Sequence, residues 1–203
     1  MKFLQISLLA LVLGLPGTAL AGGIEELTAM CDDCHGPQGA SSNSDMPIIG
    51  GQSTKFIDDT LHSFQFWGRP CVKSLYRHGD TSRPKTDMCK VAAGLTDEDI
   101  AALASHYGEL PFVPASQEFD ASQVAAGAAL HEKACESCHE QGGSSVSDRG
   151  PRTAGQWVVY MRSTMKYVPT GEHQVPPMME RGLGKFSAEE IDALMNFYAS
   201  QQD

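Results

Sequence analysis

The chain has 203 residues, with 15 Lys and Arg against 25 Asp and Glu, so its formal net charge is −10 at pH 7. A chain this acidic is not expected to bind nucleic acid or an anionic membrane surface, because both repel it. The composition suits a soluble protein whose partners present positive patches.

The first 21 residues have the pattern of a secretory signal peptide. Lys2 precedes an almost wholly apolar run over residues 3–15, and an Ala-x-Ala pattern ends at Ala21. A membrane anchor is the alternative, but the apolar run is shorter than the roughly 18 residues that a span needs. We therefore expect cleavage after Ala21 and a mature protein in the periplasm, where disulfides and covalent cofactor chemistry are both possible.

The rest of the chain repeats itself. The segment "CDDCH" at 31–35 returns as "CESCH" at 135–139, an offset of 104, and the same offset maps "GGQ" onto "AGQ". Further along, an offset of 91 maps residues 95–109 onto 186–200. The two offsets differ by 13 residues, so the first half should carry an insertion of that length before Met88.

Each half should end in an amphipathic helix. Ile100, Leu103 and Tyr107 are spaced i, i+3, i+7, which places them on one face of a helix, and Thr96 and Ser187 each begin a capping-box pattern. Helical patterns dominate, so we expect an all-α protein. The predicted organisation is a signal peptide at 1–21, a first domain at 22–110, a linker at 111–118 and a second domain at 119–203.

Cys-x-x-Cys-His is the attachment signature of c-type haem. Cysteines at i and i+3 share one face of a helical turn, so both thiols can bond to one haem while the adjacent His points at its iron. A zinc ribbon would need its Cys pairs 15–20 residues apart, and a thioredoxin-like pair a βαβ context. We therefore expect two covalently bound haem c groups. The motif residues are Cys31, Cys34 and His35, and Cys135, Cys138 and His139.

Two prolines follow the motifs at equivalent positions. Pro47 and Pro151 lie twelve residues beyond His35 and His139. In small c-type cytochromes a proline carbonyl in this region accepts a hydrogen bond from the proximal His and so fixes its orientation. The alternative is an ordinary turn proline.

Each iron also needs a ligand on its other side. Met88 and Met179 are equivalent under the 91-residue offset, and each precedes the final helix of its half. A thioether is a soft, neutral ligand that favours Fe(II) and raises the potential. Met178 is the rival of Met179 if the loop is one residue out of register, and His78 is the rival for the first iron. The other unmatched histidines suit surface or structural roles.

The remaining cysteines, Cys71 and Cys89, have no counterpart in the second half and border the 13-residue insertion. In an oxidising compartment this pattern predicts a disulfide that ties down the loop carrying Met88. The alternative makes Cys89 a thiolate ligand of the first iron.

Together, the two "CxxCH" motifs, the "GGQ" and "AGQ" segments, the paired methionines and the linker "PFVPASQEFD" resemble the dihaem cytochrome c4 family over the whole mature chain. The second half, from "LHEKACESCHEQGG" through "AGQW" to "FYASQQ", resembles the cytochrome subunit of flavocytochrome c sulfide dehydrogenase more closely still. The resemblance implies two class I cytochrome c domains related by a pseudo-twofold axis, with His/Met ligation by His35 and Met88 and by His139 and Met179. The insertion departs from the family pattern.

Three classes of function follow. The first is a periplasmic electron shuttle that delivers electrons to a terminal oxidase or another cytochrome. The second is the haem subunit of a sulfide-oxidising flavoprotein, with FAD on a partner chain because no nucleotide-binding glycine motif occurs here. The third is a dihaem enzyme such as a peroxidase or thiosulfate dehydrogenase, which the paired methionines disfavour because they leave no open position for a substrate. We expect an electron-transfer protein without catalytic residues of its own.

Overall fold

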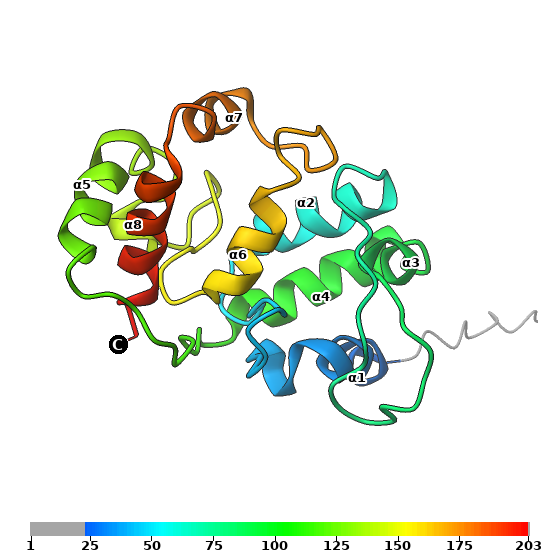
Figure 1. Ribbon diagram of the computed structural model, residues 1–203. Helices are drawn as coiled ribbons and strands as arrows, with labels where there is room; N and C mark the ends of the chain where they lie inside the picture. The colour runs from blue at the N-terminus through cyan, green and yellow to red at the C-terminus, as the bar shows by residue number, and fades with distance from the viewer. Residues whose placement is uncertain (1–22, 203) are drawn as a thin grey trace, which may run out of the picture.

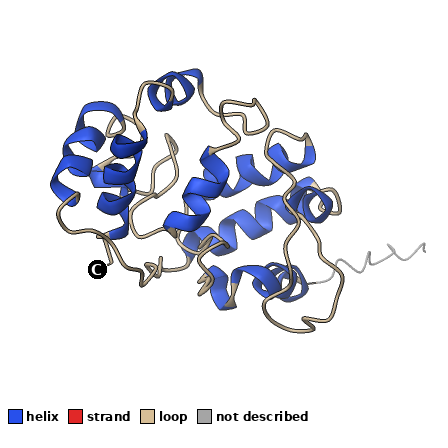
Figure 2. Ribbon diagram, viewed as in Figure 1, coloured by secondary structure: helices blue, strands red, loops and turns tan. Residues whose placement is uncertain are grey.

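The computed structural model describes residues 23–202, and the predicted signal peptide lies outside them. Within this range the secondary structure is helical apart from isolated β-bridges, which confirms the all-α prediction (Figure 2). The helices are α1 (Ile24–His35), α2 (Thr54–Gln65), α3 (Met88–Ala92), α4 (Asp97–Glu109), α5 (Val124–Ala134), α6 (Val158–Met165), α7 (Pro177–Leu183) and α8 (Ala188–Ala199). Short 3-10 turns follow the two Cys motifs. No helix within 23–202 is both long and apolar enough to cross a membrane.

The chain folds into two halves that lie side by side, with α1 to α4 in one and α5 to α8 in the other (Figure 1). In each half the last helix packs against the helix that leads into the Cys motif, α4 against α1 and α8 against α5. Each half also has its own cluster of buried apolar side chains. The two halves with their separate cores match the internal repeat of the sequence.

The final helices confirm the predicted amphipathic pattern. Ile100, Leu103 and Tyr107 are buried in the first core. Both helices begin with complete capping boxes, in which the Thr96 and Ser187 hydroxyls each accept a backbone N–H three residues ahead. Capping satisfies backbone donors that the first helical turn leaves unpaired, so both helices start at a defined residue.

The two halves are joined by a reciprocal pair of glutamines. Gln52 accepts a hydrogen bond from the Arg152 N–H at 3.0 Å and donates to the Arg152 carbonyl at 3.2 Å. Gln156 accepts from the Ile48 N–H at 3.0 Å and donates to the Ile48 carbonyl at 2.9 Å. The repeat offset maps Gln52 onto Gln156 and Ile48 onto Arg152, so the contact is made twice with the halves exchanged. This exchange is the local signature of a pseudo-twofold axis.

The two Cys motifs form helical turns as expected, but they differ in how they follow the preceding helix. Cys31, Cys34 and His35 form the last turns of α1, whereas α5 ends at Ala134, before the second motif begins. The His131 carbonyl accepts both the Cys135 and the Glu136 N–H, which ends the regular helical hydrogen-bond pattern. The second motif continues as a single turn in which the Cys135 carbonyl accepts the N–H groups of Cys138 and His139.

Candidate haem sites

The first motif lies at the C-terminal end of α1. His35 is buried, and its Nδ1 lies 3.0 Å from the Pro47 carbonyl oxygen. A carbonyl oxygen accepts only, so Nδ1 carries the proton and the lone pair is left on Nε2. That tautomer presents Nε2 as the metal-binding atom of the ring.

The second motif has the same arrangement. His139 Nδ1 lies 2.9 Å from the Pro151 carbonyl oxygen, twelve residues further along as in the first half. These two contacts confirm the predicted role of the prolines. Burial lowers the pKa of both His35 and His139, so both rings stay neutral at pH 7, which is the form that binds iron.

The four motif cysteines are free thiols rather than disulfide partners. Burial raises the pKa of Cys31 to about 12 and also raises the pKa of Cys34 and Cys135. Two cysteines three residues apart beside a buried histidine that presents Nε2 fit covalent attachment of haem.

A buried tyrosine anchors each motif to the final helix. The Tyr107 hydroxyl donates to the Asp32 carboxylate at 2.8 Å in the first half. In the second half Tyr198 bonds to His131 at 2.8 Å, and His131 reaches the Glu136 carboxylate at 2.7 Å. Burial raises the pKa of both tyrosines, so both stay protonated and able to donate. The buried His131 therefore has a structural role.

The two carboxylates also hold the loops that follow the motifs. Asp32 accepts the backbone N–H groups of Gln38 and Gly39 at 3.0 and 3.3 Å. Glu136 accepts those of Gln141 and Gly142 at 2.7 and 3.1 Å. Sequence reasoning missed this role, although an acidic residue directly after the first cysteine of both motifs was a visible signal.

The candidate sixth ligands differ in their surroundings. Met88 is the first residue of α3 and packs, with Cys31, against the first core. Met179 lies on α7 and is half-buried, whereas its neighbour Met178 has 63% of its surface exposed. A ligand must face the interior of its half, so these positions favour Met179 over Met178.

The insertion is a long loop between α2 and α3, closed by a Cys71–Cys89 disulfide with Cα atoms 5.5 Å apart. Cys89 is buried beside Met88 with its sulfur engaged, so it offers no thiolate for an iron. His78 lies close to the first motif, because its backbone N–H donates to the Asp33 carbonyl at 2.9 Å. Its Nε2 is buried without a hydrogen-bond partner among the described residues, so His78 stays a rival of Met88.

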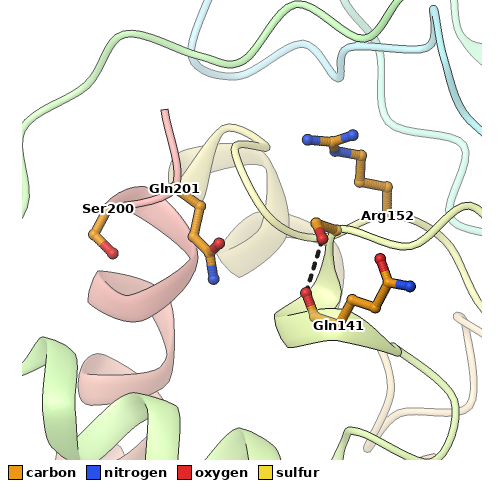
Figure 3. A pocket seen from close by; sticks show the side chains of 5 residues that line it. Gln141, Arg152, Ser200 and Gln201 are labelled. Carbon is orange, nitrogen blue, oxygen red and sulfur yellow. Dashed lines mark hydrogen bonds between the residues drawn. The ribbon is translucent and has the colours of Figure 1, made fainter. Parts of the chain in front are cut away.

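A polar hollow of about 540 Å³ lies on the second half (Figure 3). It is lined by Gln141, Ser144, Arg152, Ser200 and Gln201. The Arg152 guanidinium lies 4.2 Å from the centre of the Phe112 ring, and burial lowers its pKa. The lining contains neither a carboxylate nor a histidine, so this hollow lacks a general acid–base pair.

Comparisons with known proteins bear on both halves. Residues 122–197 match the family model described as cytochrome c oxidase, cbb3-type, subunit III. Cytochrome c-554(548) of Halomonas halodenitrificans is 31% identical over 45% of this chain and 94% of its own length. Cytochrome c4 of Pseudomonas aeruginosa is 28% identical over 79% of this chain and 78% of its own length. The chain belongs to the cytochrome c4 family of dihaem c-type cytochromes.

Three further matches cover the fold or one half of the chain. The crystal structure of cytochrome c4 from Pseudomonas stutzeri aligns with a TM-score of 0.69 at 21% identity, covering 88% of this chain and 96% of that one. The cytochrome subunit of sulfide dehydrogenase of Chlorobaculum tepidum is 34% identical over 42% of this chain and 64% of its own length. Thiosulfate dehydrogenase of Marichromatium purpuratum aligns at a TM-score of 0.65 and 24% identity, covering 84% of this chain and 36% of that one.

Membership of this family fixes the cofactor and the broad function. The protein carries two covalently bound haem c groups and is an electron-transfer protein, with two class I cytochrome c domains. When bound, haem c supplies reversible one-electron transfer at its iron.

Proposed function

We propose that this protein relays electrons between redox partner proteins in the periplasm, through two haems that are each ligated by His and Met. The first haem would be held by Cys31, Cys34, His35 and Met88, and the second by Cys135, Cys138, His139 and Met179. The haem domains would comprise residues 22–110 and 119–203, joined by the linker at 111–118, after removal of the signal peptide at Ala21.

The observation that carries this proposal is the doubled contact between a motif histidine and a proline carbonyl. It holds each imidazole in the tautomer that offers Nε2, at equivalent places in both halves. Each half then supplies one methionine before its final helix, packed against the core or half-buried. One neutral ligand on each side of an iron would leave no open coordination position, which suits electron transfer rather than substrate chemistry.

In this function the protein's own residues would orient the ligand imidazoles and keep them neutral. The prolines hold the proton on Nδ1, the Tyr107 and Tyr198 hydroxyls brace the motif turns against the final helices, and burial keeps the ligand imidazoles neutral. Such a site changes little between oxidation states, which keeps the cost of reorganisation low during electron transfer.

A second candidate is the haem subunit of a flavoprotein sulfide dehydrogenase. It is favoured by the match to the sulfide dehydrogenase cytochrome subunit of Chlorobaculum tepidum. In that role the chain would accept electrons from FAD on a partner chain and would take part in sulfur oxidation.

The test is to incubate the purified holoprotein alone with sulfide, with thiosulfate and with peroxide. An electron carrier is expected to be reduced or oxidised once, by up to two electrons per chain, without turnover. Sustained turnover by the protein alone would contradict the carrier function. Turnover of sulfide only after a flavoprotein is added would favour the subunit role over the free shuttle.

A further inference from the structure

The insertion segment, which we define as residues 69–90, has a charge opposite to that of the rest of the protein. It carries six of the 15 basic residues and two of the 25 acidic residues, so its net charge is +4 and that of the remaining chain is −14. The basic residues are Arg69, Lys73, Arg77, Arg83, Lys85 and Lys90. A concentration of one sign on an otherwise acidic protein produces a local positive potential.

The insertion segment is held in place at its base and at its tip. At the base, the disulfide and a short antiparallel bridge between Ser74 and Thr86 join its two arms. At the tip, the Asp33 carbonyl of α1 accepts the backbone N–H groups of Arg77 and His78 at 2.8 and 2.9 Å. A segment fixed at both ends offers a preformed surface and loses little entropy when a partner docks.

Ion pairs with acidic residues outside the segment reinforce the tip. Arg83 pairs with the Asp33 carboxylate, and Arg77 pairs with Asp45 at 2.5 Å. These ion pairs neutralise two of the six positive charges, and Lys73, Lys85 and Lys90 carry the exposed ones.

This surface lies directly beside the first haem motif. The Leu75 carbonyl oxygen is 4.0 Å from Cys34 Sγ, the atom that would bond to the haem. Figure 1 shows the segment running as a long loop from the end of α2 past α3 to α1. A protein that docks here therefore lies beside the first haem motif rather than the second.

The outer face combines positive charge with apolar contact area. Lys73, Lys85 and Lys90 are exposed, and none forms an ion pair with any residue in the described range. In the same segment, Val72 and Leu75 expose 56% and 45% of their surfaces. Exposed apolar groups together with charged groups are typical of protein interfaces, because the charges steer the encounter while the apolar groups provide contact area.

A hollow of about 370 Å³ completes the surface where α1, the segment and α3 meet. Half-buried Met30 and Val91 contribute apolar lining, and Lys85 and Lys90 contribute unpaired positive charge. Met30 directly precedes Cys31, so the hollow also lies next to the first motif.

We infer that the insertion segment is a docking surface for an acidic redox protein that exchanges electrons with haem 1. The inference rests on the proposed relay function and names the chemistry of one partner. The occupant is a protein with surface carboxylates beside an apolar contact, because the segment exposes unpaired lysines together with Val72 and Leu75. The second half has no counterpart of the segment, so the inference applies to haem 1 alone.

The experiment uses a reduced plant-type [2Fe–2S] ferredoxin, a strongly acidic electron donor, as the probe. Stopped-flow absorbance gives the second-order rate constant for haem reduction in the holoprotein at about 10 mM and about 0.5 M salt, where the Debye lengths are about 30 Å and less than 10 Å. Two acidic proteins repel each other as wholes, so a rate constant that falls as salt rises requires local attraction. We expect such a fall for the wild type.

Two charge-reversal variants of equal net charge locate the attraction. K73E/K85E/K90E reverses the three exposed lysines of the insertion segment, and K133E/K166E/K185E reverses three exposed lysines of the second half. We expect the first variant to lose about tenfold or more of the low-salt rate constant, within the roughly 10- to 10³-fold range of electrostatic steering, and to reverse its salt dependence. The second variant should keep the wild-type direction.

The outcomes separate this inference from the proposed function. Equal slowing in both variants, or a wild-type rate constant that rises with salt, would overturn the docking surface. Sedimentation at low salt that shows a dimer lost only in K73E/K85E/K90E would assign the surface to a second copy and would also overturn it. Far-red absorption from Met ligation and full reduction by dithionite in both variants show that the relay itself is intact.

Discussion

Replacing Gln156 by Leu should weaken the contact between the two halves more than replacing its counterpart Gln52. The Gln156 side chain is buried, accepts the N–H groups of Ile48 and Trp157, both at 3.0 Å, and donates to the Ile48 carbonyl at 2.9 Å. Leucine has a similar volume but no polar atoms, so three backbone groups lose their partner. At about 1 kcal/mol for each buried group left unsatisfied, the free energy of unfolding should fall by about 3 kcal/mol.

Guanidinium unfolding of the oxidised holoprotein, followed by tryptophan fluorescence, measures this change. Trp157 is a suitable reporter, because its indole N–H donates across the interface to the Ser41 carbonyl at 2.8 Å. Gln52→Leu removes the pseudo-symmetric contact, where two partly buried groups of Arg152 stay within reach of water, and should cost about 1 kcal/mol.

Gln201→Leu is the matched control. It removes a single hydrogen bond to the Gly142 carbonyl inside the second half and leaves the interface unchanged. A loss for Gln156→Leu no greater than the loss for Gln201→Leu would refute the view that the glutamine pair joins the halves.

Two further predictions concern the loop around α3 and the pH dependence of stability. Replacing both Cys71 and Cys89 by Ala opens a loop whose ends are 18 residues apart. The free energy of unfolding should then fall by about 3 kcal/mol in the chain-entropy model. Thermal melting measures this change, and an equal melting temperature for wild type and variant would contradict it. His173 has a pKa lowered from 6.5 to about 4, mainly by burial and also by Arg69, so its stabilising effect is complete above pH 6.5 and is lost as the pH falls toward 4. Between pH 6.5 and pH 4 the free energy of unfolding of the wild type should fall by up to about 3 kcal/mol more than that of His173→Gln. Parallel pH profiles of the two proteins would contradict this role of His173.

The parts of the fold that were predictable depend on local patterns. The spacing of Ile100, Leu103 and Tyr107 and the capping box at Thr96 determine where α4 begins and which face it buries, and both are visible within fifteen residues of sequence. The proline contact was predictable for another reason. It repeats at the same separation in both halves, so one half supports the interpretation of the other.

The contacts between distant segments were not predictable. The glutamine pair joins residues 100 and 108 positions apart, and no local pattern indicates which backbone groups lie opposite each other. The path of the insertion segment onto α1 depends on Asp33, which reads as an ordinary exposed acid in the sequence. The contacts of His131 were harder still to predict, because its counterpart in the first half is Leu27 and the repeat therefore gave no guide to them.

The choice between neighbouring methionines needed side-chain positions. Both Met178 and Met179 lie on α7, a helix of seven residues, where a shift of one residue in the alignment of the halves exchanges them. The exposed fraction of each side chain distinguishes them, because Met178 faces outward. The register of a short helix depends on tertiary packing, which a repeat offset does not contain.

Far-red absorption of the oxidised protein, from charge transfer between a methionine sulfur and ferric iron, tests the central claim of two His/Met-ligated haems most directly. Met88→Ala and Met179→Ala should each remove about half of this absorption, since each haem contributes one such ligand. His78→Ala and Met178→Ala, the rivals in each half, should retain all of it. Loss of half the absorption in Met178→Ala but not in Met179→Ala would contradict the ligand assignment in the second half, and a wild-type protein without this absorption would contradict the claim for both haems.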